Sequence, residues 1–248
     1  MRIDVYLHRS GLASSRTEAQ GFISSGAVSV DGLVITKPSY DVDGLEDKVV
    51  LDRSGKQYVS RGGIKLAAAL SAFCVNVSGK RCLDVGASSG GFTDCLLQNG
   101  ANHVIAVDSG SGQMNGTLRI DPRVSVIEGY NARYMKPADF SYVPEIAVMD
   151  VSFISATHII PALSKCLAEG ADFILLVKPQ FEVGRAHVGK GGIVKDSKAR
   201  ETALQNVISC AENNSLIKRG VIESPIRGGD GNLEYLAHFK KITGKREV

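Results

Sequence analysis

Residues 81–92, RCLDVGASSGGF, decide the fold of this 248-residue chain. A short apolar strand runs into a glycine-rich turn, and FTDCLLQNG (92–100) has the pattern of a helix closed by Gly100. This order is typical of the first turn of a doubly wound α/β sheet, where ligands bind at the carboxyl ends of the strands. Ser88 stands where the dinucleotide-binding fingerprint requires a glycine for close approach of a pyrophosphate. The loop therefore favours a different ligand.

The rest of the chain continues the alternation of strands and helices. Apolar strands are predicted at 103–108, 124–129, 145–153 and 172–179, with helices at 64–73 and around 155–168 and 198–213. Val/Ile/Leu-rich strands separated by helices indicate a parallel sheet that is covered on both faces. We therefore predict a Rossmann-like α/β domain over residues 64–248.

Residues 1–51 form a second unit, predicted as a small α+β domain. SSRTEAQGFISSG (14–26) places Ala19, Phe22 and Ile23 on one helical face, with Ser14 or Ser15 as the cap. AVSVDGLVI (27–35) predicts a hairpin that turns at Asp31-Gly32, and further breaks follow at Pro38 and Asp43-Gly44. The polar, glycine-bearing stretch 52–63 is predicted to be the linker between the domains.

Composition narrows the class of protein. The net charge of +3 neither demands nor excludes a polyanionic partner. The five cysteines stand singly, without the close pairs of a zinc or dithiol site, and fit a reducing compartment. The N-terminus lacks the apolar run of a signal peptide, and FILLV (173–177) is too short to span a bilayer. We expect a cytoplasmic protein without a membrane segment.

Basic residues accumulate in the C-terminal part of the chain. They fit either a surface for a polyanion or an ordinary solvated face. They are Lys190, Lys195, Lys198, Arg200, Lys218, Arg219, Arg227, Lys240, Lys241, Lys245 and Arg246.

Polar residues at the strand ends indicate what the glycine-rich loop binds. Asp84 ends the first strand and suits the ammonium of an amino-acid tail, while a helix N-terminus suits the carboxylate. Asp108 ends the second strand, where a ribose diol would lie. Together they predict a site for S-adenosylmethionine made by Asp84, Gly86, Ser88, Gly90, Gly91, Phe92, Asp108, Asn131 and Asp150. The alternatives are that the Gly-Gly turn only lets a helix pack close to a strand, and that Asn131 only forms an Asx-turn.

Four further charges form a candidate catalytic set. Asp150 and Lys178 each close an apolar strand, Lys65 begins the first helix of the second domain, and Glu234 lies in the strand-like NLEYLAHF (232–239). A buried lysine is costly unless it is paired, and burial favours its neutral form. Two bases and two acids beside a sulfonium fit methylation of a ribose hydroxyl without a metal, because a neutral lysine can accept the hydroxyl proton. The alternative is a pair of structural ion pairs.

Several motifs resemble one known family. DVGASSGGF, EGYNAR, MDVSFIS, LVKPQFEVGR, KGGIVKD and SPIRGGDGNLEY are similar to those of the TlyA-type, haemolysin-A-like rRNA methyltransferases, relatives of the FtsJ/RrmJ ribose methyltransferases. The resemblance implies a class I methyltransferase fold whose sheet ends in an antiparallel strand. It also implies S-adenosylmethionine-dependent cytidine 2′-O-methylation of ribosomal RNA on subunits or ribosomes, with a Lys65, Asp150, Lys178 and Glu234 tetrad in which Lys178 is the base. EGYNAR departs from the family pattern, which often has threonine before the asparagine.

The N-terminal residues resemble the alpha-L RNA-binding module of small-subunit ribosomal protein four. The resemblance makes Arg2, Arg9, Ser15, Arg16 and Lys37 candidates for RNA contact. Arg61 in the linker and Lys190 in a basic loop join them as candidates for the phosphate backbone. The linker segment YVSRGG (58–63) runs straight into Lys65, which suggests a relay from RNA contact to the active site.

Three other functions compete with this interpretation. A haemolysin-like membrane-active protein is opposed by the lack of a spanning segment or a basic amphipathic helix. A pseudouridine synthase can carry the same N-terminal module but needs a different catalytic fold. A catalytically silent RNA- and S-adenosylmethionine-binding protein is opposed by the presence of all four tetrad residues. Neither the oligomeric state nor the modified nucleotide follows from the sequence.

Overall fold

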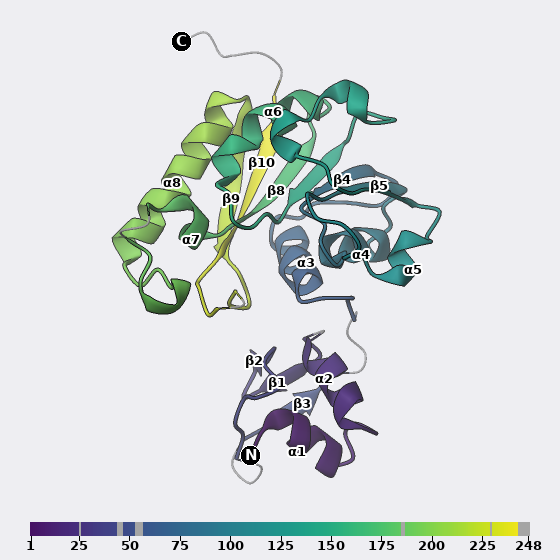
Figure 1. Cartoon of the computed structure of the whole chain (residues 1–248), viewed down its shortest axis with the longest axis vertical. Coiled ribbons are helices and arrows are strands. Elements are labelled where there is room, and N and C mark those ends of the chain that lie inside the picture. The colour runs from purple at the N-terminus through teal and green to yellow at the C-terminus, as the bar shows by residue number, and fades with distance from the viewer. Residues whose placement is uncertain (25, 44–46, 53–56, 185–186, 229, 243–248) are drawn as a thin grey trace.

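Two units make up the structure, a computed structural model in which a small N-terminal unit lies beside a larger α/β unit (Figure 1). The structure describes all residues except 25, 44–46, 53–56, 185–186, 229 and 243–248. The predicted turn at Gly44, the middle of the linker, and Lys245 and Arg246 lie outside the described residues.

The N-terminal unit packs two helices against a small sheet. Helices α1 (Ile3–Arg9) and α2 (Arg16–Ser24) precede strands β1 (Val28–Val30), β2 (Leu33–Val34) and β3 (Val49–Leu51), in the order β2-β1-β3. The predicted hairpin is confirmed, since Asp31 and Gly32 both have positive φ, at 50° and 82°, as a type I′ turn requires. Ser15 caps α2, because its hydroxyl accepts the Glu18 N–H at 3.1 Å.

A buried carboxylate holds the two N-terminal helices together. Asp4 is fully buried and accepts hydrogen bonds from Arg2 at 3.0 and 3.1 Å, Arg16 at 2.9 Å and Gln20 at 3.0 Å. Burial alone would raise the pKa of Asp4, but these hydrogen bonds outweigh it and hold the pKa well below its usual range. The carboxylate therefore stays ionised and ties α1 to α2.

The larger unit is built on a seven-stranded sheet in the order β6-β5-β4-β7-β8-β10-β9. Strands β4 (Arg81–Val85), β5 (His103–Val107), β6 (Val124–Ile127), β7 (Ile146–Met149) and β8 (Asp172–Val177) are parallel. Strands β9 (Leu216–Glu223) and β10 (Tyr235–Lys241) are antiparallel to their neighbours. The predicted Rossmann-like fold with an antiparallel C-terminal strand is confirmed. Strand β9 was not predicted, because LIKRGVIE is too polar to show a buried pattern.

Helices cover both faces of this sheet (Figure 1). One apolar core joins α3 (Gly62–Ala72) and α4 (Gly91–Gln98) to one face, and a second joins α6 (Ile160–Cys166) and α8 (Ser197–Asn213) to the other. The short elements are α5 (Gly116–Arg119), η1 (Ala132–Tyr134), η2 (Pro137–Asp139), η3 (Ala156–His158), α7 (Pro179–Glu182) and η5 (Lys190–Gly192). No helix among the described residues is long and apolar enough to cross a membrane.

The order of the strands reverses between β4 and β7. Gly86 follows β4 and Asp150 follows β7, and the two backbones meet there. Gly86 has φ of +83°, and a Cβ on it would lie 2.4 Å from the Asp150 carbonyl oxygen. Only glycine fits this position. In doubly wound folds the ligand crevice opens at such a reversal.

Asp84, the fourth residue of β4, is the most deeply buried acid of the larger unit. The Thr93 hydroxyl donates to its Oδ2 at 2.7 Å, whereas its Oδ1 has no hydrogen-bond partner among the described residues. Burial raises the pKa of Asp84 to about 7, against the effect of the Thr93 hydrogen bond, and the charge of Asp150 adds to the rise. The folded protein therefore favours the protonated carboxyl.

Asp84→Asn is expected to make stability less dependent on pH. The Asp84 carboxyl ionises near its ordinary pKa of 3.8 in the unfolded chain and at about 7 in the folded protein. The folded state binds the additional proton between these values. The wild type therefore loses stability as pH rises from about 4 to about 7, by at most about 1.4 kcal/mol per pH unit relative to the variant.

Urea unfolding of both proteins, without ligand and at each pH, measures this difference. Asp41→Asn, at an exposed aspartate, is the matched control and is expected to follow the wild type. Identical pH slopes for the wild type and Asp84→Asn would contradict the prediction.

Candidate active site

Two cavities meet at the carboxyl edge of the sheet. One, of about 290 Å³, is lined by residues that include Lys65, Asp150, Lys178 and Glu234, and we call it the catalytic cavity. The other, of about 460 Å³, extends over the ends of β5 and β7, and we call it the cofactor cavity. Both are lined by Gly86, Ser88, Asp150 and Ser152. These four residues therefore form the boundary between the two cavities.

Asp108 presents a carboxylate to the cofactor cavity. Its Oδ2 accepts the Ser88 N–H at 2.8 Å and its Oδ1 accepts the Gly110 N–H at 2.7 Å. A carboxylate has about four lone-pair sites, so acceptor capacity remains on each oxygen. Asp108 is thus fixed in place and still able to accept two hydroxyl hydrogen bonds, as a ribose diol requires.

The glycines of the loop have packing roles as well. A Cβ on Gly90 would lie 2.4 Å from Leu118 of α5, and one on Gly91 would lie 2.2 Å from the Ser60 hydroxyl. Gly91 and Phe92 line the catalytic cavity, whereas Gly90 lines neither cavity. Close packing of the helix, the alternative to a ligand-binding role, therefore accounts for Gly90. Gly91 has a packing role as well as a place in the lining of the catalytic cavity.

Asn131 forms the predicted turn and lies at the cofactor cavity, so its contact with the adenine stays a prediction. Its side chain caps η1 by accepting the Arg133 N–H at 3.2 Å, and it also lines the cofactor cavity.

The structure corrects the interpretation of Asp84. We expected this carboxylate to bind an ammonium group, but it lines neither cavity and points inward to Thr93. The last residues of a central strand alternate between the two faces of the sheet, and Asp84 falls on the side covered by α4. Its hydrogen bond with Thr93 joins β4 to α4, the two elements that the glycine-rich loop connects.

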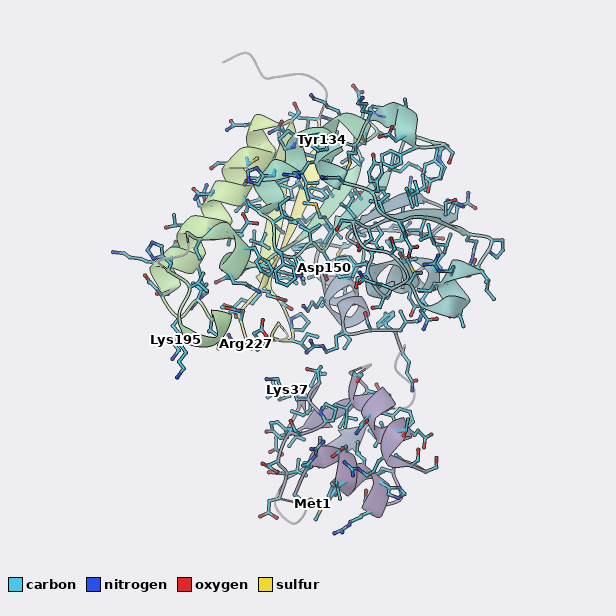
Figure 2. The ribbon with its side chains drawn as sticks, in the orientation of Figure 1. Met1, Lys37, Tyr134, Asp150, Lys195 and Arg227 are labelled. Carbon is cyan, nitrogen blue, oxygen red and sulfur yellow. The ribbon has the colours of Figure 1, made fainter. Side chains whose placement is uncertain are left out.

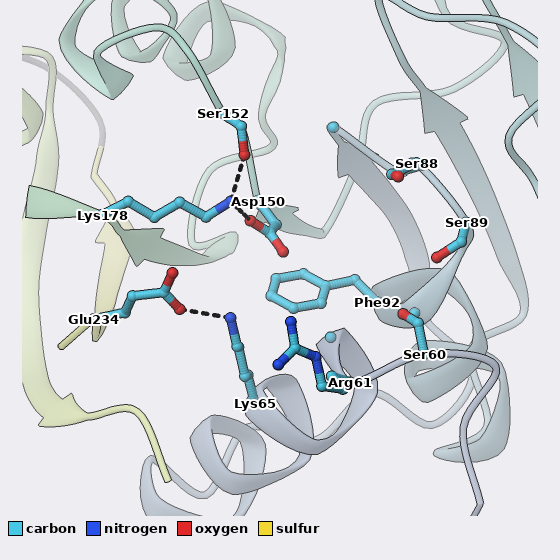
Figure 3. Close-up of a pocket in the computed structure, with 14 residues that line it drawn as sticks. Ser60, Arg61, Lys65, Ser88, Ser89, Phe92, Asp150, Ser152, Lys178 and Glu234 are labelled. Atoms are coloured by element: carbon cyan, nitrogen blue, oxygen red, sulfur yellow. Dashed lines mark hydrogen bonds and ion pairs between the residues drawn. The ribbon is translucent and has the colours of Figure 1, made fainter. Parts of the chain in front are cut away.

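Lys178 and Asp150 meet at the boundary of the two cavities (Figure 3). The Lys178 Nζ lies 2.6 Å from Asp150 Oδ1, as an ion pair without the angle of a hydrogen bond. It donates a hydrogen bond to the Ser152 hydroxyl at 2.7 Å. These two contacts hold the amine at the edge of the catalytic cavity.

Lys65 and Glu234 form the second pair. They are 7% and 2% exposed, and the Lys65 Nζ lies 2.5 Å from Glu234 Oε2. Glu234 precedes β10 directly, so the prediction that it lies inside the strand is wrong by one residue. Gly228 packs against this carboxylate, because a Cβ there would lie 2.4 Å from Glu234 Oε1. All four tetrad residues thus line one cavity as two ion pairs (Figure 3).

Sequence reasoning missed several residues of this site. Ser152 orients Lys178, and Gln113 accepts a hydrogen bond from the Ser88 hydroxyl at 2.9 Å beside the cofactor cavity. Phe153 is 91% exposed at the rim of that cavity, with a φ of +64°. A phenylalanine in this backbone region is strained, and such strain concentrates at functional sites. In the motif MDVSFIS, Ser152 and Phe153 closely follow Asp150, and this position next to a predicted site residue could have identified them.

The end of the linker packs on the helix that follows the glycine-rich loop. The Val59 N–H donates to Asp94 of α4 at 2.8 Å, and the Gln98 amide donates to the Gln57 carbonyl at 2.8 Å. Ser60 lines the catalytic cavity beside Gly91. The described end of the linker is therefore part of the wall of the site.

The RNA-contact candidates occupy different settings. Arg2 and Arg16 share Asp4 and remain about half exposed, at 47% and 52% of their side chains. Arg9 and Lys190 are exposed, and the Ser15 hydroxyl is used as a helix cap. Lys37 is exposed on the N-terminal unit, whereas Arg61 lines the catalytic cavity.

Comparison with known proteins matches both units to known families. The FtsJ-like methyltransferase family matches residues 58–241, and the S4 domain family matches residues 1–49. The 16S/23S rRNA (cytidine-2′-O)-methyltransferase TlyA of Mycobacterium tuberculosis is 44% identical, over 98% of this chain and 91% of that protein. Hemolysin A of Brachyspira hyodysenteriae is 43% identical, over 96% and 99% of the two chains.

A solved structure of a Streptococcus thermophilus protein shares the architecture. It has a TM-score of 0.75 and 42% identity, and covers 98% of this chain and 89% of its own. The resemblance drawn from the motifs is confirmed: the chain belongs to the FtsJ-like methyltransferase family and carries an S4 domain at its N-terminus.

Proposed function

We propose that this protein transfers a methyl group from S-adenosylmethionine to the 2′-hydroxyl of a cytidine ribose in ribosomal RNA. The observation that carries the proposal is the position of Lys178, whose amine lies between Asp150 and Ser152 at the boundary of the two cavities. The family is one of methyltransferases, and the M. tuberculosis relative is named for cytidine 2′-O-methylation of rRNA.

The cofactor cavity suits the methyl donor. Asp108 would accept the ribose diol, and the backbone from Gly86 to Ser88 would lie along the methionine part. When bound, the donor supplies an electrophilic methyl on a sulfonium. Asp150 and Ser152 line both cavities, so the residues that hold Lys178 also border the donor.

Lys178 would act as the general base. A 2′-hydroxyl is a poor nucleophile until its proton is removed, and a Lys178 amine that has released its own proton can accept it. The Lys178 Nζ would accept the hydroxyl proton as the hydroxyl oxygen takes the methyl group from the donor, which would leave as the thioether. Asp150 and Ser152 orient the amine and stabilise the ammonium that forms. Lys65 and Glu234 line the same cavity as a second ion pair.

Phe153 provides a surface for the RNA at the same place. Its ring is exposed and leans on Phe181, with ring centroids 5.2 Å apart. Unpaired RNA bases stack on exposed aromatic rings. Phe153 directly follows Ser152, which borders both cavities, so its ring suits the base of a nucleotide whose ribose enters the catalytic cavity.

Lys178→Ala is expected to abolish methylation. Loss of a general base costs about 10²- to 10⁴-fold in rate, while the donor site, built mainly by other residues, keeps its affinity. The assay measures ribose-linked label from tritiated S-adenosylmethionine on unmodified small subunits, large subunits and whole ribosomes. Equilibrium titration measures donor binding.

Lys178→Arg is the matched control for charge. An arginine keeps the positive charge beside Asp150, but it cannot accept a proton at neutral pH. We expect it to be as inactive as the alanine variant. Full activity of Lys178→Arg would exclude the base role, and no label from the wild type on any substrate would overturn the proposed function. Red-cell lysis that survives Lys178→Ala would instead support a membrane activity.

Phe153→Ala is expected to raise the apparent KM for ribosomal substrate by roughly fivefold to a hundredfold, the value of one stacked base. Phe153→Tyr keeps an aromatic ring and is expected to stay near the wild type. Steady-state kinetics with saturating S-adenosylmethionine separate KM from kcat. An unchanged KM in Phe153→Ala would show that the ring does not contact the RNA.

A further inference from the structure

A third cavity lies between the two units. It has a volume of about 300 Å³ and is lined by the hairpin segment 33–37 with Tyr40 on one side and by residues 223–228, 231 and 233 on the other. Arg61 of the linker completes it. We call it the interdomain cavity. The two units touch beside it, where the Arg61 guanidinium lies 3.5 Å from the Thr36 hydroxyl. Ile64 also packs against Gly26, with no room for a Cβ.

The lining combines apolar surface with unpaired positive charge. Leu33 and Tyr40 are exposed, at 61% and 38%, and Ile226 and Leu233 lie across from them. Three cations, Lys37, Arg61 and Arg227, line the cavity together with a single acid, Glu223. None of the three cations forms an ion pair with any residue that the structure describes.

The position of these cations suits an anionic chain. Figure 2 shows Lys37 on the N-terminal unit and Arg227 on the larger unit, on opposite sides of the space between them. Phosphate groups are bound by such lysine and arginine side chains, while bases stack on aromatic rings and guanidinium planes. A flat apolar group flanked by a phosphate therefore matches both the apolar and the charged parts of the lining.

The interdomain cavity adjoins the active site through two features. Arg61 lines both the interdomain cavity and the catalytic cavity, where it lies near Lys65 and Phe92 (Figure 3). Leu233 of the lining directly precedes Glu234, and Gly228 of the lining packs on the Glu234 carboxylate. An occupant of the interdomain cavity thus touches the segment that positions one tetrad residue.

We propose that the interdomain cavity binds an unpaired nucleotide of the RNA substrate, near the methylated nucleotide in the folded RNA. The base lies against Tyr40 and the apolar residues, and its phosphates contact Lys37, Arg61 and Arg227. This inference rests on the proposed function for the identity of the RNA. The cavity is then a substrate subsite built jointly by the two units.

Binding to unmodified ribosomal subunits, measured by filter retention without a methyl donor, tests the subsite independently of catalysis. Arg227→Ala is expected to weaken affinity roughly tenfold and to reduce the slope of log affinity against log salt by about 1, as loss of one phosphate contact predicts. Tyr40→Ala is expected to weaken affinity by roughly fivefold to a hundredfold with an unchanged salt slope, because stacking releases no counterions.

Two control variants sharpen the test. Tyr40→Phe keeps the ring and is expected to bind as the wild type does. Lys165→Ala removes an exposed positive charge on α6, on the side of the larger unit away from the N-terminal unit (Figure 1), and is expected to change neither affinity nor slope. Thermal unfolding and donor affinity of each variant verify that the fold is intact.

The outcomes separate the two proposals. The subsite would be overturned if both Arg227→Ala and Tyr40→Ala bound subunits with wild-type affinity, or if Lys165→Ala lost as much affinity as they do. A wild type that does not bind subunits would overturn it as well. A wild type that binds subunits without methylating them would overturn the proposed function, while the pattern among the variants would still decide the subsite.

Discussion

The contact between Gly86 and the Asp150 backbone is the constraint on which the rest of the site depends. The sheet reverses its order between β4 and β7, so the loops that follow these strands diverge and leave a crevice between them. A side chain at Gly86 would strike the Asp150 carbonyl and push the two loops apart. Asp150 and the nearby Ser152 both contact the Lys178 amine, so this close approach also helps to place the two partners of that amine.

Buried charge is tolerated at this edge because each charge has a partner. Removing one member of a buried pair leaves the other uncompensated, at a cost of about 3–5 kcal/mol. The hypothesis that the tetrad forms structural ion pairs is therefore compatible with the hypothesis that it is catalytic. The two pairs differ, since Lys65 and Glu234 are almost fully enclosed, whereas Lys178 and Asp150 border open cavity. Chemistry is better placed on the second pair, where a substrate atom can approach the amine.

The sequence predicted the strands whose residues are buried on both faces of the sheet. Prediction failed for strands and side chains whose placement depends on residues in other elements. The parallel strands were evident from continuous apolar runs, and the hairpin from Asp31-Gly32. Strand β9 is a polar edge strand and β3 has only three residues, so neither carries a pattern of its own. The direction of the Asp84 side chain depended on Thr93, nine residues away, which position at a strand end does not reveal.

Prediction of the site residues was limited in a similar way. Strand-end positions were enough to bring Lys178 and Asp150 together, because parallel strands end at one edge. They did not reveal that Ser152 would complete the amine's contacts or that Arg61 would border two cavities, since both depend on loop paths. The N-terminal unit is nearly neutral in sequence, and Asp4 offsets part of the charge of Arg2 and Arg16. Lys37, which forms no ion pair with the residues that the structure describes, instead faces Arg227 across the interdomain cavity, so positive charge gathers where the units meet.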